Sequence, residues 1–523
     1  MAPLLERSFV LSLPWGWISS VSAFICFVSY YVYYAYLHPY AKYPGPFLSK
    51  FTHLRSGYYA WKGDIHLDIW RCHQKYGPIV RYSYNFLIFD SASTAKEIYS
   101  TGVNVTKASE YTSGKLTPNM VTHVDIREHA KRRKLAGPPF SLTNVKRFET
   151  RLQGYVQRFM DALQPSNISP ISPSSWGSPI DMTDWCSYFT FDVMSDFLFG
   201  LKYDLLHDSQ HRHIVHDIEN THQRLYVLMH FRALFLGRLD KKLFPQAVRS
   251  SRGYLGFIDR LLKDYSCLSE KTQTDIFSAF AEAKDYANNP VFTPDELRSE
   301  AILMSSAGQD TTAVALRSII FYLTRYPNAY EKLCHEIRTT FSADEAIGIN
   351  EKLKSCSYLN ACLTESLRMS PVIGSALYRE VGPGGASFNG VRIPEGCYVG
   401  AGTYSIHHKE EYFSQPFEFL PERWIVDENS TQEQVNQRLQ AWMPYSLGPR
   451  GCVGKTLAQN VLLVAVASLV QKYDLRVADT PEGRSGAGHP MGDFGRTNPG
   501  EYQLRDFIVA ASAGPVIQVR PRV

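Results

Sequence analysis

The stretch "MPYSLGPRGCVGKTLA", from Met443 to Ala458, places one cysteine among three glycines, directly before an apolar run. Glycines at every third position, Gly448, Gly451 and Gly454, favour a tight loop whose backbone approaches a flat surface and whose amides can point at sulfur. The apolar run has helical spacing, so Cys452 should also lie near a positive helix N-terminus. Amides and a helix N-terminus favour thiolate over thiol. Cys452 is therefore a candidate metal ligand; a nucleophile or a buried apolar side chain are the alternatives.

Length and composition leave the domain count open and exclude several classes of protein. The chain has 523 residues, 44% of them hydrophobic, with no internal repeat, coiled-coil heptad or long low-complexity segment. Its nine cysteines are scattered without a CxxC pair, which argues against a disulfide framework or a zinc site and fits a reducing compartment. The net charge of +5 is mild and no tract of Lys and Arg resembles a nucleic-acid-binding arm, so no nucleic-acid partner is expected.

The N-terminal segment predicts a membrane anchor. No charged residue occurs from Ser8 to Leu37, and "WISSVSAFICFVSYYVYYAYL" is largely apolar or aromatic, enough to cross a bilayer of about 30 Å as a helix. A cleaved signal peptide is the alternative, but the span is long for one and lacks a convincing cleavage site. Lys42, Lys50 and Arg55 follow the span, which weakly places the bulk of the protein on the cytosolic side. We expect residues 1–42 to form an anchor and a proline-rich hinge.

A second strong signal is a long helix in the segment "FTPDELRSEAILMSSAGQDTTAVALRSIIFYLTRYP". Thr293 and Glu296 form a capping box with proline at the first helical position, and Pro327 marks the end. These signals predict one helix from Pro294 to Arg325, roughly 48 Å long and able to cross a domain.

Gly308 interrupts this predicted helix at its middle, where glycine costs about 1 kcal/mol relative to alanine. Close approach of a flat ligand could offset the cost, as could local opening of the hydrogen-bond ladder aided by a threonine hydroxyl. The alternative is a helix packing contact at Gly308, with Asp310 solvated. The residues of this segment alone leave both interpretations open.

Two further motifs predict a buried ion cluster. In "TESLRMSP", Glu365 and Arg368 share one helical face, and in "FEFLPERW", Arg423 could complete a Glu-Arg-Arg group. Buried charges persist only when they are paired and hydrogen-bonded, so such a group would be a structural latch and not a catalytic one.

Taken in order, the four motifs resemble those of the cytochrome P-450 haem-thiolate monooxygenases of microsomal type. The family shows A/G-G-x-D/E-T-T, then E-x-x-R, then P-E-R-[WF], then F-x-x-G-x-R-x-C-x-G. The matching segments here are Ala307 to Thr312, Glu365 to Arg368, Pro421 to Trp424, and Tyr445 to Gly454. Two departures are Tyr445, where phenylalanine is usual, and His129, where many relatives have tryptophan. The resemblance runs from about Tyr43 to the C-terminus.

The resemblance implies a mainly α fold with a smaller β region, the cytochrome P-450 fold, preceded by one N-terminal transmembrane helix. Residues 43–523 would form the haem-thiolate monooxygenase domain. "GPIVRYSYNFLIFD" and "GVRIPEGCYVGAGTYS" are the segments whose β-branched and aromatic content predicts strands. The implied cofactor is haem b with Cys452 as the axial thiolate, which donates electron density that promotes cleavage of dioxygen.

The resemblance also implies roles for other residues, carried over position by position. Arg450 and Arg379 would pair with a haem propionate, and His129 and Arg133 with the other. Asp310 and Thr311 would form the acid-alcohol pair that relays protons. The remaining roles are haem contact by Tyr445 and Gly308, support of the cysteine loop by Glu365, Arg368 and Arg423, and substrate-pocket lining by Leu303, Met304, Ala307, Val372, Ile373 and Ala376.

The implied activity is oxidation of a lipophilic or aromatic metabolite with dioxygen. The segment from Tyr43 to Tyr82 resembles fungal enzymes that tailor secondary metabolites. No dinucleotide fingerprint follows a strand, so the electrons of NADPH should arrive through a separate NADPH-cytochrome P-450 reductase, with cytochrome b5 as a second donor. Residues 131–134, "KRRK", could contribute to docking it, although a solvated helix face is an alternative for Lys131, Arg132 and Lys134.

We expect a single-pass protein of the endoplasmic reticulum membrane with its catalytic domain in the cytosol. Two other activities stay open. One is oxidative coupling of phenols or indoles on the same scaffold. The other is haem binding without turnover, against which the Asp310-Thr311 pair argues, because a carrier has no use for a proton relay.

Overall fold

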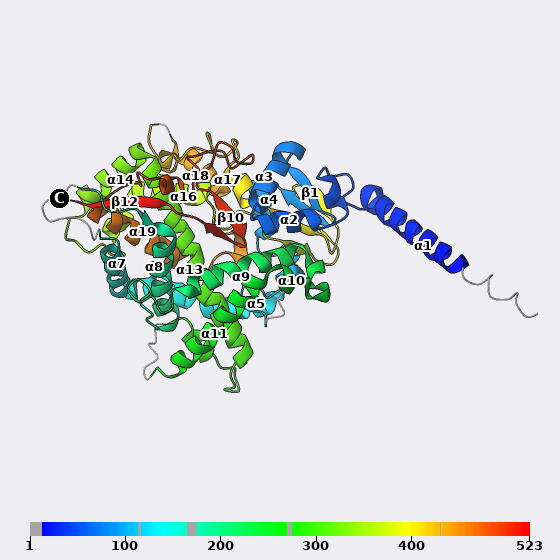
Figure 1. The fold of residues 1–523 in the computed structure, drawn as a ribbon, viewed down its shortest axis with the longest axis horizontal. Coiled ribbons are helices and arrows are strands. Elements are labelled where there is room, and N and C mark those ends of the chain that lie inside the picture. The colour runs from blue at the N-terminus through cyan, green and yellow to red at the C-terminus, as the bar shows by residue number, and fades with distance from the viewer. Residues whose placement is uncertain (1–12, 113–116, 165–174, 269–274, 429, 523) are drawn as a thin grey trace, which may run out of the picture.

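The structure is a computed structural model that describes residues 13–112, 117–164, 175–268, 275–428 and 430–522. Helices make up most of the body, with small sheets set among them, and one helix projects from the body at the N-terminal end (Figure 1). The prediction of a mainly α fold with a smaller β region is confirmed.

The projecting helix is α1, Leu13–Val32, which continues through a π-helical turn at Tyr33–Leu37. Gly16–Leu37 is long and apolar enough to cross a membrane, with a mean hydropathy of 1.4 and no buried part. The body begins before the expected boundary at residue 43, because Arg81 Nη1 donates a hydrogen bond to the Tyr34 carbonyl over 2.7 Å and Tyr40 is 1% exposed in a core cluster.

The central helix, α13, has the predicted bounds Pro294–Arg325, and Thr293 and Glu296 form the predicted capping box. It packs against α8, Met182–Phe199, α11, Pro245–Ser266, α16, Ser357–Met369, and α19, Lys455–Lys472 (Figure 1). The other helices are α2 Leu54–Lys62, α3 Ile65–Tyr76, α4 Ala92–Tyr99, α5 Ile126–Ala136, α6 Leu142–Arg147, α7 Glu149–Ala162, α9 His213–His230, α10 Leu239–Leu243, α12 Ser278–Ala281, α14 Pro327–Thr340, α15 Glu351–Lys354, α17 Thr403–His407 and α18 Gln432–Ala441.

The largest sheet has five strands in the order β1-β2-β8-β5-β3, in which only β2 and β8 run parallel. Three smaller sheets have the orders β4-β12-β9, β10-β11 and β6-β7. Both segments that were predicted to form strands do so. The strands are β1 Ile79–Ser83, β2 Phe86–Phe89, β3 Val105–Lys107, β4 Ile180–Asp181, β5 Arg379–Val381, β6 Ala386–Phe388, β7 Val391–Ile393, β8 Tyr398–Ala401, β9 Tyr473–Val477, β10 Leu504–Phe507, β11 Val509–Ser512 and β12 Val516–Pro521.

Candidate functional site

The cysteine loop is as tight as its glycines predict. Gly448 has φ of +66°, and a Cβ on it would lie 1.9 Å from the carbonyl oxygen of Tyr99. The Cys452 amide donates to the Tyr445 carbonyl over 2.9 Å, and Gly454 caps the N-terminus of α19. The loop therefore presents Cys452 beside a helix N-terminus, where a larger residue at position 448 would clash.

The Cys452 side chain has free surface although protein surrounds it. Burial raises the pKa of its thiol, while the amides of Gly454 and Lys455 and the charge of Arg133 lower it only in part. We expected the loop alone to lower the pKa of the thiol and so favour the thiolate. The pKa is raised instead, because the effect of burial is larger than that of the amides. Because the Cys452 side chain is exposed between these neighbours, we infer that it faces an opening.

Four cations gather near Cys452: Arg133, Arg379, Arg450 and Lys107. Within the described residues, none of them has a carboxylate at ion-pair distance; Arg133 donates to the Gly451 carbonyl over 2.8 Å and Arg450 to the His123 carbonyl over 2.7 Å. Burial and the charges of Arg379 and Arg450 hold the pKa of Lys107 well below its usual value. Burial, with Arg379 next in weight, lowers the pKa of Arg450 to about 10. The site is short of negative charge.

Lys107 is a member of this group that the sequence analysis missed. It lies directly opposite Arg379 in the antiparallel pairing of β3 with β5. Opposed residues of such a pair project on the same face, where like charges repel unless an anion lies between them. The only sequence signal was a lone lysine in a segment without a motif.

His129 and Tyr445 border the same opening. Burial, and then the charges of Arg450 and Arg133, lower the pKa of His129 to about 4, so it is a neutral hydrogen-bonding group at pH 7. The Tyr445 hydroxyl is buried without a hydrogen-bond partner among the described residues, and burial raises its pKa. A phenylalanine would leave no such unsatisfied group.

At the middle of α13, Thr311 Oγ1 donates to the Ala307 carbonyl over 2.7 Å. This is the threonine-to-carbonyl bond expected if a threonine hydroxyl helps to open the hydrogen-bond ladder beside Gly308. A Cβ on Gly308 would lie 3.1 Å from Met194 Sδ, a contact tighter than usual. Gly308 therefore serves the packing of α13 on α8. The expectation that a flat ligand approaches Gly308 stays a prediction.

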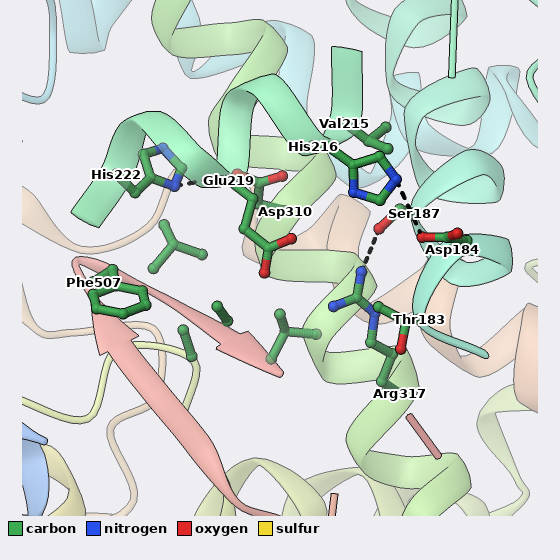
Figure 2. Close-up of a pocket in the computed structure, with 14 residues that line it drawn as sticks. Thr183, Asp184, Ser187, Val215, His216, Glu219, His222, Asp310, Arg317 and Phe507 are labelled. Carbon is green, nitrogen blue, oxygen red and sulfur yellow. Dashed lines mark hydrogen bonds and ion pairs between the residues drawn. The ribbon is translucent and has the colours of Figure 1, made fainter. Parts of the chain in front are cut away.

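Asp310 lies on another side of α13 and is not solvated, contrary to the packing interpretation. It is 8% exposed, and its Oδ2 lies 3.5 Å from Nδ1 of His222 on α9 (Figure 2). Burial, and then the negative charge of Glu219, raise its pKa well above the usual range. Burial and Glu219 therefore favour the protonated, uncharged form of Asp310.

The predicted ion cluster forms. Arg368 donates to both oxygens of Glu365 over 2.8 and 2.9 Å, and Arg423 Nε donates to Glu365 Oε1 over 3.0 Å. His407, which the sequence analysis missed, joins the cluster to the cysteine loop, because its Nδ1 bonds the Arg368 carbonyl over 3.1 Å and its Nε2 accepts from the Met443 amide over 3.0 Å.

The expected pocket residues divide into two groups. Met304, Val372 and Ala376 are 6%, 8% and 5% exposed and belong to hydrophobic core clusters. Met304 precedes Gly308 by one helical turn and so shares its face toward α8, and its assignment to the pocket stays a prediction. Leu303, Ala307 and Ile373 are half-buried, which leaves them as candidate lining residues.

A family model described as "Cytochrome P450" matches residues 39–492. The chain belongs to the cytochrome P-450 family. Cytochrome P-450 monooxygenases bind haem b through a cysteine thiolate, and this chain is an oxidoreductase of that class. Such monooxygenases need a redox partner that supplies electrons and a lipophilic substrate.

Similar cytochrome P-450 monooxygenases occur in fungi. The chain is 38% identical over 518 residues to poxM of Penicillium oxalicum, covering 98% of this chain and 97% of the relative. It is 35% identical over 493 residues to AKT7 of Alternaria alternata, covering 94% of each, and 35% identical over 506 residues to atnE of Emericella nidulans, covering 95% of each.

The residues of this cytochrome P-450 fit the family's cofactor. Haem b has two propionates, and the four cations around the Cys452 opening have no carboxylate of the described chain to pair with. Two added carboxylates would supply the missing partners, including an anion between Lys107 and Arg379. The fit of haem b to this site rests on the positive charge of the four cations and on the exposed surface of Cys452.

One expectation about the reductase-docking surface is wrong. Arg132 was grouped with Lys131, Arg133 and Lys134, either in a basic docking face or on a solvated helix face. Its side chain is fully buried and pairs with Glu300 on α13 over 3.1 Å. Arg132 therefore fastens α5 to α13 and is not available to a partner protein.

Proposed function

We propose that Cys452 supplies the axial thiolate in this cytochrome P-450, and that the enzyme oxidises a lipophilic or aromatic metabolite. The observation that carries the proposal is the exposed Cys452 side chain together with four cations that have no carboxylate at ion-pair distance among the described residues. Haem b bound there supplies the activation of dioxygen. The division into an anchor and hinge, residues 1–42, and a catalytic domain, residues 43–523, is part of the proposal, although packing reaches back to Tyr34.

In this proposal Arg379, Arg450, Arg133 and Lys107 neutralise the two propionates, and neutral His129 adds a hydrogen bond. Tyr445 packs on the ring. A charged hydrogen bond to a buried carboxylate contributes about 1.5–3 kcal/mol. Removing one of the four cations should therefore weaken haem binding. In the haem-free protein the same change should be stabilising, because the remaining cations repel one another less when no propionate lies between them.

Lys107→Met is expected to weaken haem binding roughly tenfold or more. The same change is expected to stabilise the haem-free chain, since it removes a buried cation opposite Arg379. Haem transfer to a stronger acceptor and thermal unfolding of the haem-free protein measure the two effects. Lys134→Met, an exposed lysine on α5, is the control. Unchanged haem transfer in Lys107→Met would remove Lys107 from the proposed propionate site.

Asp310 and Thr311 form the proposed acid-alcohol pair. Burial and the charge of Glu219 favour the protonated form of Asp310, because both raise its pKa. Thr311 holds its hydroxyl against the Ala307 carbonyl, from which it can turn to pass a proton into the pocket. Leu303, Ala307 and Ile373 exclude water around that route.

Thr311→Ala is expected to lower the product formed per NADPH about tenfold or more while haem content is retained. NADPH consumption, product and hydrogen peroxide are measured together. Thr324→Ala is the matched control, because Thr324 makes the same bond to the Ile320 carbonyl, over 2.9 Å, near the end of the same helix. Native coupling in Thr311→Ala would contradict the relay.

We infer that electrons come from NADPH-cytochrome P-450 reductase, with cytochrome b5 as a second donor. The apolar helix Gly16–Leu37 supports single-pass insertion in the endoplasmic reticulum membrane, with the catalytic domain in the cytosol. Lys131 and Lys134, both exposed, remain in the proposed docking face.

A second cavity supports an aromatic substrate class. It lies between α2, the β1-β2 hairpin and the end of α9, and is lined by Tyr82, Phe86, Tyr378 and Tyr398 among others. The Tyr378 hydroxyl bonds His230 Nε2 over 2.9 Å, and the Tyr398 hydroxyl donates to Glu110 over 2.9 Å. Rings with hydroxyl groups suit ring systems that carry polar substituents. With fungal relatives, these features favour secondary-metabolite biosynthesis.

High-resolution mass comparison of metabolite extracts from cells with the intact gene and with Cys452→Ser tests the proposed function. Loss of a species one oxygen heavier than an accumulating precursor is expected. Loss of a species equal to two precursors less two hydrogens would instead indicate oxidative coupling of phenols or indoles. No difference between extracts would favour haem binding without turnover.

A further inference from the structure

A crevice of about 420 Å³, part of it open to solvent, lies between α8, α9, α13 and the β10-β11 hairpin. Figure 2 shows Glu219, His222, Asp310 and Arg317 projecting toward one another in it. At its rim, His216 and Asp184 lie 3.5 Å apart and are 51% and 46% exposed. Charged side chains line it beside apolar ones such as Val215, Val314 and Phe507, and the described residues contain no group of ligands able to hold a metal ion.

We propose that this crevice is the proton inlet of the enzyme, and that His222 passes each proton to Asp310. Nδ1 of His222 lies 3.5 Å from Asp310 Oδ2, which has no hydrogen-bond partner among the described residues. Thr311 follows about 100° further round the helix, and the proposed transfer requires the Asp310 carboxyl to turn toward it about its own side-chain bonds. The proposal rests on the proposed roles of Asp310 and Thr311 and adds the route by which Asp310 is recharged.

The charges around this pair place the proton on the acid at rest. Burial lowers the pKa of His222 to about 4, and burial and Glu219 raise that of Asp310. Arg317 opposes the rise only in part, and its own side chain donates to Ser187 and Ser512. The charged or titratable groups around Asp310 are Glu219, His222 and His216 of α9, Arg317 of α13, Asp184 of α8 and Tyr254 of α11; β10 and β11 add only Phe507, Val509, Ala510 and Ala511.

One turnover of the route conserves protons. Asp310 gives its O–H proton to Thr311 and becomes a carboxylate. That charge raises the basicity of the neighbouring imidazole. With its proton on Nδ1, His222 gives this proton to Asp310 Oδ2 and takes a proton from crevice water on Nε2; the ring then regains its Nδ1–H form by exchange through crevice water, and bulk solvent neutralises the hydroxide left behind. The water loses one proton to the chain, and one proton reaches Thr311. Glu219 makes the return step favourable because its negative charge opposes ionisation of Asp310.

The test combines infrared spectroscopy of the holoenzyme with turnover. The carbonyl stretch of protonated Asp310, identified by its loss in Asp310→Asn, should be present at neutral pH and disappear as pH rises through the raised pKa. His222→Phe should move this band to higher wavenumber, because the Asp310 carboxyl loses the polar His222 nitrogen that faces it. It should also slow product formation about tenfold or more, with a larger solvent deuterium isotope effect.

Glu219→Gln is the second variant. Removing its charge should lower the pH at which the Asp310 band disappears, since a negative neighbour no longer opposes ionisation. His213→Phe, at an exposed position of α9, is the control for an added ring on this helix and should leave band and turnover unchanged.

If the Asp310 carbonyl band does not shift and turnover is native in His222→Phe, the proposal that the crevice is the proton inlet is wrong. The spectrum of the ferrous carbon monoxide complex separates this outcome from failure of the proposed function. A thiolate-type spectrum in every variant leaves the proposed function standing while the inlet fails, whereas its absence from the native protein would contradict the proposed function itself.

Discussion

Cys452→Ser is expected to abolish product formation and the thiolate-type spectrum of the ferrous carbon monoxide complex. Residues that only support a metal ligand typically contribute ten- to a hundredfold, so loss of the ligand itself should cost more than about a hundredfold in activity. A serine hydroxyl is a poor donor at neutral pH, and the cationic pocket would still attract the propionates. Cys452→Ser should therefore lose its activity while it retains part of its haem.

The matched control is Cys267→Ser, which changes an exposed cysteine at the end of α11. It should leave spectrum and turnover as in the native enzyme. A thiolate-type spectrum that survives in Cys452→Ser would mean that another of the nine cysteines binds the iron, and the proposed site would be wrong.

Glu365→Gln is expected to lower the free energy of unfolding by about 3–5 kcal/mol, because two buried guanidinium groups lose their only shared carboxylate. Arg368 and Arg423 are 0% and 5% exposed. The cysteine loop should loosen at the same time, since His407 connects Arg368 to the Met443 amide. Thermal loss of the thiolate-type spectrum measures both effects in the holoenzyme.

Glu422→Gln is the comparison for Glu365→Gln, since Glu422 is 39% exposed and pairs with Lys332 over 2.7 Å. It should cost at most about 1 kcal/mol. Burial opposes ionisation of Glu365, but Arg368 and Arg423 outweigh it and hold its pKa below the ordinary value. Its contribution to stability is therefore present above the unfolded-state pKa and lost as pH falls through the lower folded-state pKa. Equal stability of Glu365→Gln and Glu422→Gln would contradict the structural role of the buried ion cluster around Glu365.

The sequence predicted features that are coded locally. The bounds of α13 follow from Thr293, Glu296 and two prolines, and the spacing of Glu365 from Arg368 places both on one face. The tight cysteine loop likewise follows from its glycines. In each case the interacting groups are within a few residues of one another, or a motif marks the distant partner.

The missed features depend on strands and helices that meet only in the folded chain. Lys107 was missed because it lies near Arg379 only when β3 pairs with β5. His222 was missed because it lies near Asp310 only when α9 crosses α13. Arg132 was expected in solvent because its partner Glu300 lies on a distant segment.

The pairing of Lys107 with Arg379 also bears on how this protein matures in the cell. Strand β3 is at the edge of the five-stranded sheet, and it ends at Lys107. Before the cofactor is incorporated, repulsion between the opposed cations favours fraying of that edge, which leaves backbone groups of β5 open to pairing with other chains. Haem supply during synthesis should therefore decide how much of the chain escapes aggregation, so that yield in a production host follows cofactor biosynthesis as well as transcription.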